Sequence, residues 1–216
     1  MDIEAARQQM IDQQVRAWDV LDPRVLDALA RVPRERFVPP AYRDLAFADA
    51  PIPLPQGQSM LPPKLDARIL QACEIAAGDS VIEVGTGSGF LAACLATLAG
   101  RVESLELRPV LAEFASGNLR AAGFLGVAVH VADGTVWQPR AAADVVVLSA
   151  SLPVYDARYE QWLAPGGRLF AVVGAAAPMC AQLVTRVSER EFARTELFET
   201  FVDPMTNARR PSAFVF

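Results

Sequence analysis

The hydrophobic and polar positions divide the chain into a helical and irregular first part and a longer part in which apolar runs alternate with helices. In residues 3–18 the apolar side chains recur at helical spacing, which predicts a helix. A second helix is expected where Asp22 can cap the backbone and Pro23 takes the first helical position. Residues 32–63 are rich in proline and show no period, so we expect an ordered irregular segment or a lid there, followed by a helix over 64–75.

From residue 80 onward the pattern becomes regular. Apolar runs that predict strands cover residues 80–84, 101–107, 127–133, 144–150 and 168–174. Helical patterns lie between them at residues 89–99, 109–123 and 155–163. The runs are continuous and do not alternate with polar residues, as is typical of parallel strands covered on both faces. The sequence therefore predicts an α/β fold with a doubly wound, mostly parallel sheet.

The end of the chain departs from this alternation. Residues 181–202 and 212–216 are predicted to add antiparallel strands at the edge of the sheet. We expect one structural unit overall, in which residues 1–62 form a helical and irregular segment that packs over the site. Residues 63–216 are then the domain that holds the site.

Composition and charge exclude several classes of function. The chain has 216 residues and a net charge of −5, without a run of Lys or Arg that would indicate nucleic-acid binding. No apolar stretch approaches the length of a membrane span. Cys73, Cys94 and Cys180 are too far apart to suggest a metal site, and we expect them to be buried and reduced. These features predict a cytoplasmic protein with no bound metal and no membrane or nucleic-acid partner.

The stretch VIEVGTGSGF, residues 81–90, predicts a nucleotide-binding turn between a strand and a helix. Its glycines form GxGxG, and Phe90 stands where a dinucleotide-binding turn has its third glycine. Glu83, two residues before the first glycine, would repel a pyrophosphate and attract a cation. S-adenosyl-L-methionine (SAM) has no phosphate and carries a sulfonium and an ammonium, so the turn favours SAM over NAD.

Two further acidic residues lie at the ends of the next two predicted strands. Glu106 lies roughly 20 residues past the glycines, where an acidic residue can accept both hydroxyls of a ribose. Asp133 is followed by Gly134, and the pair can either meet an adenine edge or simply form a turn. Glu106 can likewise be an ordinary surface acid. The single histidine, His130, falls inside an apolar strand, so we expect it to be packed in the core or half-buried and not to take part in catalysis.

Six motifs, in a fixed order, resemble those of a known family. They are VPRERFVP, the Gly57-Gln58 pair, VIEVGTGSGF, SLEL, ADG and LAPGGRLFAVVG. Together they resemble the protein-L-isoaspartate O-methyltransferases over about residues 8–175. The resemblance implies a Rossmann-like SAM methyltransferase that produces S-adenosyl-L-homocysteine. Its acceptor would be the free carboxylate of isoaspartyl residues in an aged protein or peptide, whose methylation starts a return to aspartyl through a succinimide.

The resemblance also implies roles for particular residues. The methionine part of SAM would be held by Glu83, Gly85, Thr86, Gly87, Ser88 and Gly89. The ribose would be held by Glu106 with Leu107, and Asp133 and Gly134 would flank the adenine. The loop that covers SAM and faces the acceptor would contain Gln58, Ser59 and Met60, with Asp49 as an acid just upstream. We expect Gln58, Ser59 and Asp49 to serve catalysis.

The chain departs from the family pattern mainly on the acceptor side. The family loop GQTIS becomes GQSML, so that Leu61 replaces a serine with a catalytic role and Ser59 replaces a threonine. From this loss we expect normal SAM binding and weak methylation of isoaspartyl peptides. Three alternatives stay open: a SAM methyltransferase with another acceptor, a SAM-binding protein without turnover, and, least favoured, an NAD oxidoreductase. The sequence carries no signal for the oligomeric state.

Overall fold

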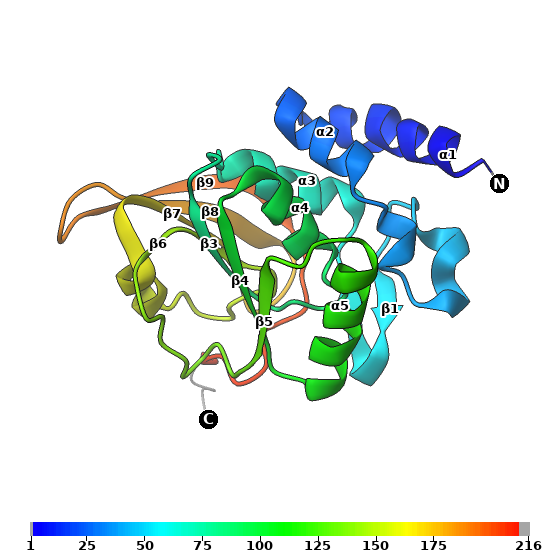
Figure 1. Cartoon of the computed structure of the whole chain (residues 1–216). Helices are drawn as coiled ribbons and strands as arrows, with labels where there is room; N and C mark the ends of the chain where they lie inside the picture. The colour runs from blue at the N-terminus through cyan, green and yellow to red at the C-terminus, as the bar shows by residue number, and fades with distance from the viewer. Residues whose placement is uncertain (1, 212–216) are drawn as a thin grey trace.

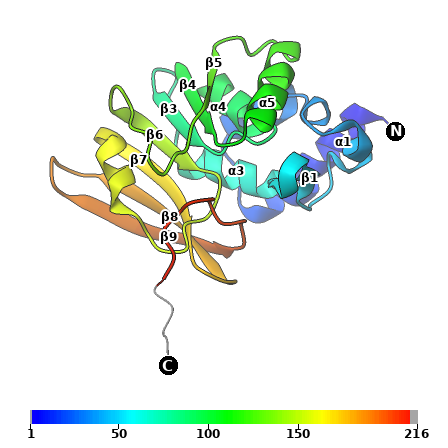
Figure 2. The same cartoon turned by 90° about the horizontal axis from the view of Figure 1, so that it is seen from below.

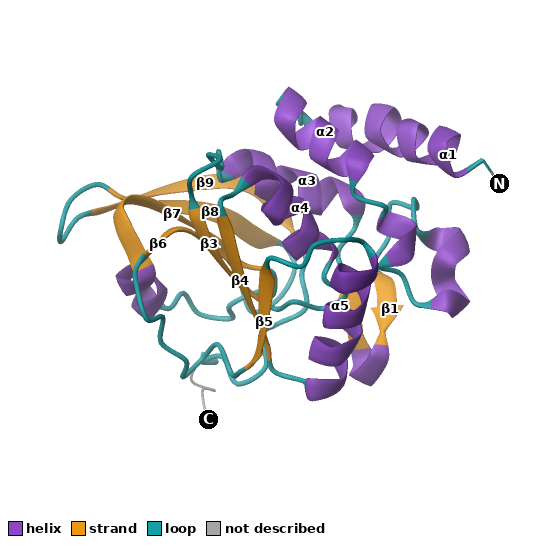
Figure 3. Ribbon diagram, in the orientation of Figure 1, coloured by secondary structure: helices purple, strands orange, loops and turns teal. Residues whose placement is uncertain are grey.

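The computed structural model describes residues 2–211 and contains a central sheet with helices packed around it (Figures 1 and 3). The α-helices are α1 (Ile3–Met10), α2 (Pro23–Arg31), α3 (Pro63–Ala72), α4 (Phe90–Leu98) and α5 (Pro109–Ala121). The strands of the central sheet are β3 (Ser80–Val84), β4 (Arg101–Glu106), β5 (Val127–Val131), β6 (Ala143–Leu148), β7 (Leu163–Val173), β8 (Met179–Arg186) and β9 (Phe192–Thr200). Shorter helical turns are η1 (Ile11–Val15), η2 (Arg16–Trp18), η3 (Arg34–Arg36), η4 (Pro40–Leu45), η5 (Pro55–Gly57) and η6 (Ala157–Trp162).

The order of strands in the sheet is β5-β4-β3-β6-β7-β8-β9. The first five of these are parallel, and β8 and β9 are antiparallel additions at one edge. The predicted α/β fold with a mostly parallel sheet and antiparallel edge strands is therefore confirmed. The strand expected at residues 212–216 lies outside the described residues.

The two faces of the sheet are covered unequally. Along β6, Val145 and Val147 point into a core shared with the α-helices, whereas Val146 and Leu148 belong to a second core on the other face. That second core is covered by the short η6 turn, whose Trp162 is 1% exposed, and by loops. The alternation along one strand thus buries both faces, as its continuous apolar sequence predicts.

The N-terminal segment packs on the helical side of the sheet, near α3 and α4 (Figures 1 and 2). Residues 3–18 form one continuous helical stretch, as predicted, through α1, η1 and η2. The side-chain oxygen of Gln71 on α3 accepts hydrogen bonds from the backbone N–H groups of Leu21 and Asp22, at 2.7 and 3.0 Å. Apolar residues of α1 and α2 share one hydrophobic core with α3 and α4. The division at residue 62 stays a prediction.

Three local predictions were wrong. The segment at 32–63 contains a small antiparallel hairpin of β1 (Ile52–Leu54) and β2 (Gln58–Met60), whose strands are too short to give a periodic signal. The helix predicted at 155–163 is only the η6 turn, and β7 begins at once after it. His130 was expected in the core or half-buried, but it is exposed because β5 is the edge strand. Its side chain is 44% exposed and lies 3.3 Å from Glu103.

Two negative findings apply to residues 2–211. No helix is long and apolar enough to cross a membrane. No cluster of His, Cys, Asp and Glu side chains is arranged to hold a metal ion. The three cysteines are free, with Cys73 and Cys94 buried and Cys180 partly buried.

Candidate functional site

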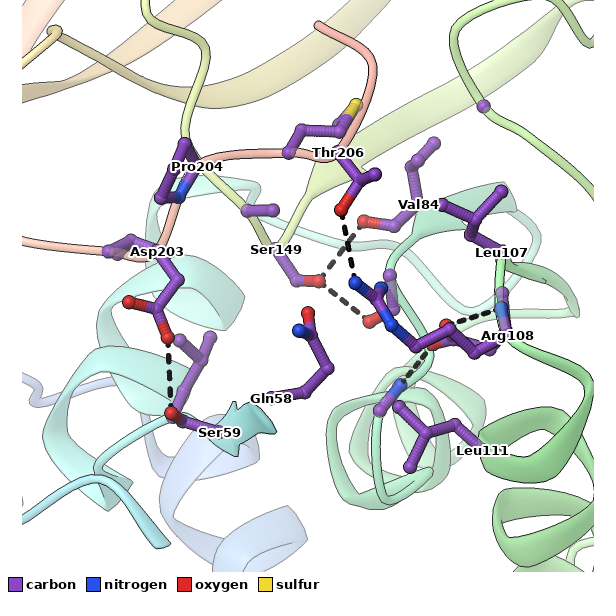
Figure 4. A pocket seen from close by; sticks show the side chains of 18 of the residues that line it. Gln58, Ser59, Val84, Leu107, Arg108, Leu111, Ser149, Asp203, Pro204 and Thr206 are labelled. Carbon is purple, nitrogen blue, oxygen red and sulfur yellow. Dashed lines mark hydrogen bonds between the residues drawn. The ribbon is translucent and has the colours of Figure 1, made fainter. Parts of the chain in front are cut away.

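The candidate site lies where the strand order reverses, between β3 and its neighbours β4 and β6. At such a point in an open α/β sheet the loops diverge and leave a crevice beyond the carboxyl ends of the strands. A cleft of about 180 Å³ lies there (Figure 4). Its walls come from β2, the glycine turn after β3, the ends of β4, β5 and β6, and residues 201–206 of the tail. A smaller inner cavity of about 40 Å³ shares several of these residues.

The glycine turn brings the backbone close to both cavities. Gly85 has φ +104°, and a Cβ atom there would collide with the hydroxyl of Ser149. That hydroxyl donates to the carbonyl oxygens of Val84 and Gly85, at 3.0 and 2.7 Å. Gly87 has φ +56° and lines both cavities. Glycine is needed at both positions because other residues adopt a positive φ only at a cost.

Glu83 is fully buried and lines the inner cavity. Its Oε2 atom accepts a hydrogen bond from Ser104 Oγ at 2.5 Å, and that hydroxyl lies 2.6 Å from Thr86 Oγ1. Its other oxygen, Oε1, has no hydrogen-bond partner. Burial raises the pKa of Glu83 to about 8, and the charges of Asp66 and Glu106 also raise it. A buried carboxyl oxygen without a partner beside a cavity is suited to a cationic or hydrogen-bond-donating ligand.

Glu106 ends β4 at the edge of the cleft and is 4% exposed. One carboxylate oxygen accepts from the backbone N–H of Gly87 and the other from that of Arg108, both at 3.0 Å. The carboxylate is thereby fixed relative to the glycine turn. Each oxygen can accept a further hydrogen bond, so the predicted contact with two ribose hydroxyls is compatible with this geometry.

Asp133 and Gly134 both line the cleft. Asp133 Oδ1 accepts from the backbone N–H and the hydroxyl of Thr135, at 2.8 and 2.7 Å, so that the residue forms the turn. Oδ2 accepts from Asn207 at 2.8 Å. Burial acts to raise the pKa of Asp133, but these hydrogen bonds outweigh it and hold the pKa below its usual value. Both readings of Asp133, as a turn former and as part of the cleft wall, therefore agree with the structure.

The loop that the sequence assigned to the acceptor side forms another wall of the cleft. Gln58, Ser59, Met60 and Leu61 all line it, and the last three also line the inner cavity. Met60 is 4% exposed, whereas Ser59 is open to solvent. The Leu61 side chain is partly buried against the hydrophobic core.

Several predicted site residues lie away from both cavities or line only one of them. Asp49 is exposed, pairs with Lys64 Nζ at 2.8 Å and lines neither cavity. Gly89 faces α5, where an added Cβ would lie 3.2 Å from Leu119, so it serves helix packing. Thr86 and Ser88 line only the inner cavity, and Leu107 lines only the cleft. The functional roles of all these residues stay predictions.

The structure also adds residues that the sequence did not single out. Ser149 follows β6, and its place at the end of a parallel strand is a signal that could have identified it. Arg108 reaches Thr206 Oγ1 at 3.2 Å across the cleft, and Ser59 Oγ donates to Asp203 Oδ2 at 3.1 Å (Figure 4). Nothing local in the sequence places the tail at this site, because these contacts join distant parts of the chain.

Comparison with known proteins gives a consistent family match. The profile of the family described as "Protein-L-isoaspartate(D-aspartate) O-methyltransferase (PCMT)" matches residues 5–210. A protein-L-isoaspartate O-methyltransferase of Rhodopseudomonas palustris is 39% identical over 202 residues, covering 92% of both chains. One from Methanoculleus marisnigri is 39% identical over 186 residues, covering 86% of this chain and 83% of its own.

Solved structures share the fold at lower identity. A Plasmodium falciparum structure described as a PCMT in complex with S-adenosyl-L-homocysteine superposes with a TM-score of 0.82 at 16% identity. It covers 95% of this chain and 99% of its own. A second structure, named protein-L-isoaspartate O-methyltransferase, has a TM-score of 0.78 at 20% identity and covers 92% of this chain and 65% of its own.

Proposed function

Because the chain belongs to the protein-L-isoaspartate(D-aspartate) O-methyltransferase family, we propose that it methylates the free carboxylate of isoaspartyl residues in damaged proteins or peptides. It is a SAM-dependent methyltransferase, as the family is. The observation that supports the site best is the pair of cavities at the reversal of strand order, which the glycine turn borders. The buried Glu106 lines the cleft, and the buried Glu83 lines the inner cavity. The acceptor is the carboxylate that an isoaspartyl linkage leaves free beside the main chain.

The residues of the site fit SAM better than a dinucleotide. The unpartnered Oε1 of Glu83 can accept from a ligand ammonium, and Glu106 can accept from ribose hydroxyls. Both side chains carry or can develop negative charge, which opposes a pyrophosphate. Gly85 and Gly87 permit the close approach of ligand to backbone. Asp133, Gly134 and Leu107 then form the wall at the nucleoside end.

The chemistry supplied by bound SAM is a methyl group on a sulfonium, a good leaving group. This chain's residues have to align the acceptor carboxylate with that methyl group and exclude water. Gln58, Ser59 and Met60 line the cleft, and we assign them to the wall that faces the acceptor. The acceptor carboxylate is ionised at neutral pH, so no side chain has to remove a proton from it. His130, on the edge strand β5, lines neither cavity and is not needed as a base.

Transfer of labelled methyl groups to a matched pair of peptides tests this function. One peptide carries an isoaspartyl linkage, and the other has an ordinary aspartyl residue at the same place. We expect methylation of the isoaspartyl peptide alone, with formation of S-adenosyl-L-homocysteine. Equal labelling of both peptides, or labelling of neither, would reject the proposed acceptor.

The cellular setting of the reaction is also a proposal. The three cysteines are free, which is consistent with the reducing conditions of the cytoplasm. We therefore place the protein there, acting on isoaspartyl proteins or peptides. Fractionation of cells that produce the protein would test this placement.

A further inference from the structure

A carboxylate of the protein itself occupies the acceptor wall of the cleft. Asp203 comes from the tail after β9, and its Oδ2 accepts the hydrogen bond of Ser59 Oγ at 3.1 Å (Figure 4). Both residues line the cleft. The proposed function assigns the Ser59 hydroxyl to the acceptor side. In this structure that hydroxyl already donates a hydrogen bond to the Asp203 carboxylate.

The position of Asp203 is fixed by its backbone. Its carbonyl oxygen accepts from the backbone N–H of Ser151 at 2.9 Å. The hydroxyl of Ser151, which is fully buried, donates to the carbonyl oxygen of Val202 at 2.8 Å, and the backbone N–H of Met205 donates to the Ser151 carbonyl at 2.8 Å. The tail is therefore tied to the end of β6 on both sides of Asp203, and the carboxylate is held at the cleft.

The residue that follows Asp203 prevents its side chain from forming a succinimide. The next residue is Pro204, which has no backbone N–H. A succinimide forms when the following backbone nitrogen attacks the side-chain carbonyl, and a proline nitrogen has no hydrogen to lose. Asp203 therefore cannot follow the route from aspartyl to isoaspartyl that the proposed substrates have taken.

We propose that Asp203 is a specificity-determining residue that competes with the acceptor carboxylate for Ser59. This inference rests on the proposed function. A carboxylate that enters beside Ser59 meets a like charge and a hydroxyl that is already engaged. Like charges brought close together oppose binding, and because Ser59 and Asp203 are both exposed, salt can screen this repulsion. Asp203 thus limits acceptance to isoaspartyl peptides whose other contacts outweigh this repulsion.

The test measures the binding of an isoaspartyl peptide to the protein saturated with S-adenosyl-L-homocysteine. We expect Asp203→Asn, which keeps the shape but removes the charge, to tighten peptide binding roughly tenfold. Binding of S-adenosyl-L-homocysteine should stay unchanged. Glu199→Gln is the matched control, since it makes the same change in net charge at an exposed residue of β9 that lines neither cavity.

Three additional measurements test whether the charge of Asp203 causes the effect. Raising the salt concentration should tighten peptide binding to the wild type and have less effect on Asp203→Asn, because salt screens the repulsion. The neutral methyl ester of the same peptide should bind the two proteins equally. In a double-mutant cycle with Ser59→Ala, the two substitutions should not be additive, since the residues share one hydrogen bond.

The outcomes distinguish this inference from the proposed function. Equal or weaker peptide binding by Asp203→Asn, with methylation of the isoaspartyl peptide intact in both proteins, would overturn the competition and leave the function standing. Failure of both proteins to bind or methylate the isoaspartyl peptide, with normal S-adenosyl-L-homocysteine binding, would overturn the acceptor and this inference together.

Discussion

At the scale of single residues, the site combines fixed carboxylates with one position, Leu61, where the family pattern has a serine and this chain has no hydroxyl. Glu83 and Glu106 are held by hydrogen bonds on the cofactor side. On the acceptor side, Leu61 offers only apolar surface, and the hydroxyl of Ser59 is engaged by Asp203. Substitutions at Glu106 and Leu61 should therefore affect different steps, the first cofactor binding and the second methyl transfer.

Replacing Glu106 by alanine should weaken cofactor binding. The side chain is placed to make charge-assisted hydrogen bonds to a ribose, which are worth about 1.5–3 kcal/mol, or roughly tenfold or more in affinity. Calorimetric titration with S-adenosyl-L-homocysteine measures the change. Glu106→Gln is the control, because it keeps the size of the side chain. Unchanged affinity in Glu106→Ala would remove this residue from the ribose site.

Replacing Leu61 by serine should raise the rate of isoaspartyl methylation. A hydroxyl at this place on the cleft wall can orient the acceptor carboxylate, and an alignment contact of about 1.4 kcal/mol corresponds to roughly tenfold in rate. Initial rates with an isoaspartyl peptide measure the effect, and S-adenosyl-L-homocysteine affinity should change little. Robust isoaspartyl-selective turnover by the wild type, with no gain in Leu61→Ser, would show that Leu61 only packs beneath the loop.

At the scale of elements, one buried arginine joins three parts of the chain: the residue after η4, the acceptor-side loop of residues 58–61, and α3. Arg34 is fully buried; its Nε donates to the Ala46 carbonyl at 2.9 Å, Nη1 to Asp66 at 2.7 Å, and Nη2 to the Leu61 carbonyl at 2.5 Å. Its guanidinium also lies 4.5 Å from the Phe90 ring centroid at the start of α4. A single side chain thus contacts the residue after η4, the loop of residues 58–61, α3 and the start of α4.

Removing this arginine should destabilise the protein strongly. Arg34→Met leaves Asp66 buried without its partner, which typically costs about 3–5 kcal/mol. Arg31→Met is the matched control, because the Arg31–Asp27 pair is exposed and such pairs are worth less than about 1 kcal/mol. Urea unfolding of both variants measures the difference. Similar stabilities for the two variants would contradict the role given to the buried pair.

How far the sequence predicts each element depends on whether its signal is local. The strands and the glycine turn are encoded by runs of neighbouring residues, and they were predicted closely. The Ser59–Asp203 contact joins residues 144 positions apart, and periodicity does not detect such a contact. The exposure of His130 depends on β5 lying at the edge of the sheet, which the apolar pattern of β5 alone does not encode.

At the scale of the whole molecule, buried carboxyl groups connect the site to the stability of the fold. Burial raises the pKa of Glu83 to about 8 and, against the opposing charge of Arg34, that of Asp66 to about 6. Both residues line the inner cavity. A site built to receive a cation therefore has a cost when no cation is present, since the buried carboxyl group must then either keep its proton or ionise without a partner.

The stability of the ligand-free protein should reflect this cost. Glu83 holds its proton more tightly in the folded chain than at its ordinary pKa of 4.5. The stabilising contribution of the protonated group is complete below about pH 4.5 and is lost as the pH rises towards 8. Urea unfolding from pH 5 to 9 should show the wild type losing stability relative to Glu83→Gln over this window. Parallel curves for the two proteins would contradict a raised pKa for Glu83.

The conversion of an isoaspartyl peptide to its aspartyl form tests the proposed activity most directly. The protein is incubated with SAM and a peptide containing one isoaspartyl linkage, and the products are separated by chromatography. We expect SAM-dependent loss of the isoaspartyl peptide and the appearance of its methyl ester, the succinimide and the aspartyl peptide. The matched aspartyl peptide should remain unmethylated. An isoaspartyl peptide that stays unchanged in the presence of SAM, or equal methylation of both peptides, would contradict the proposed function.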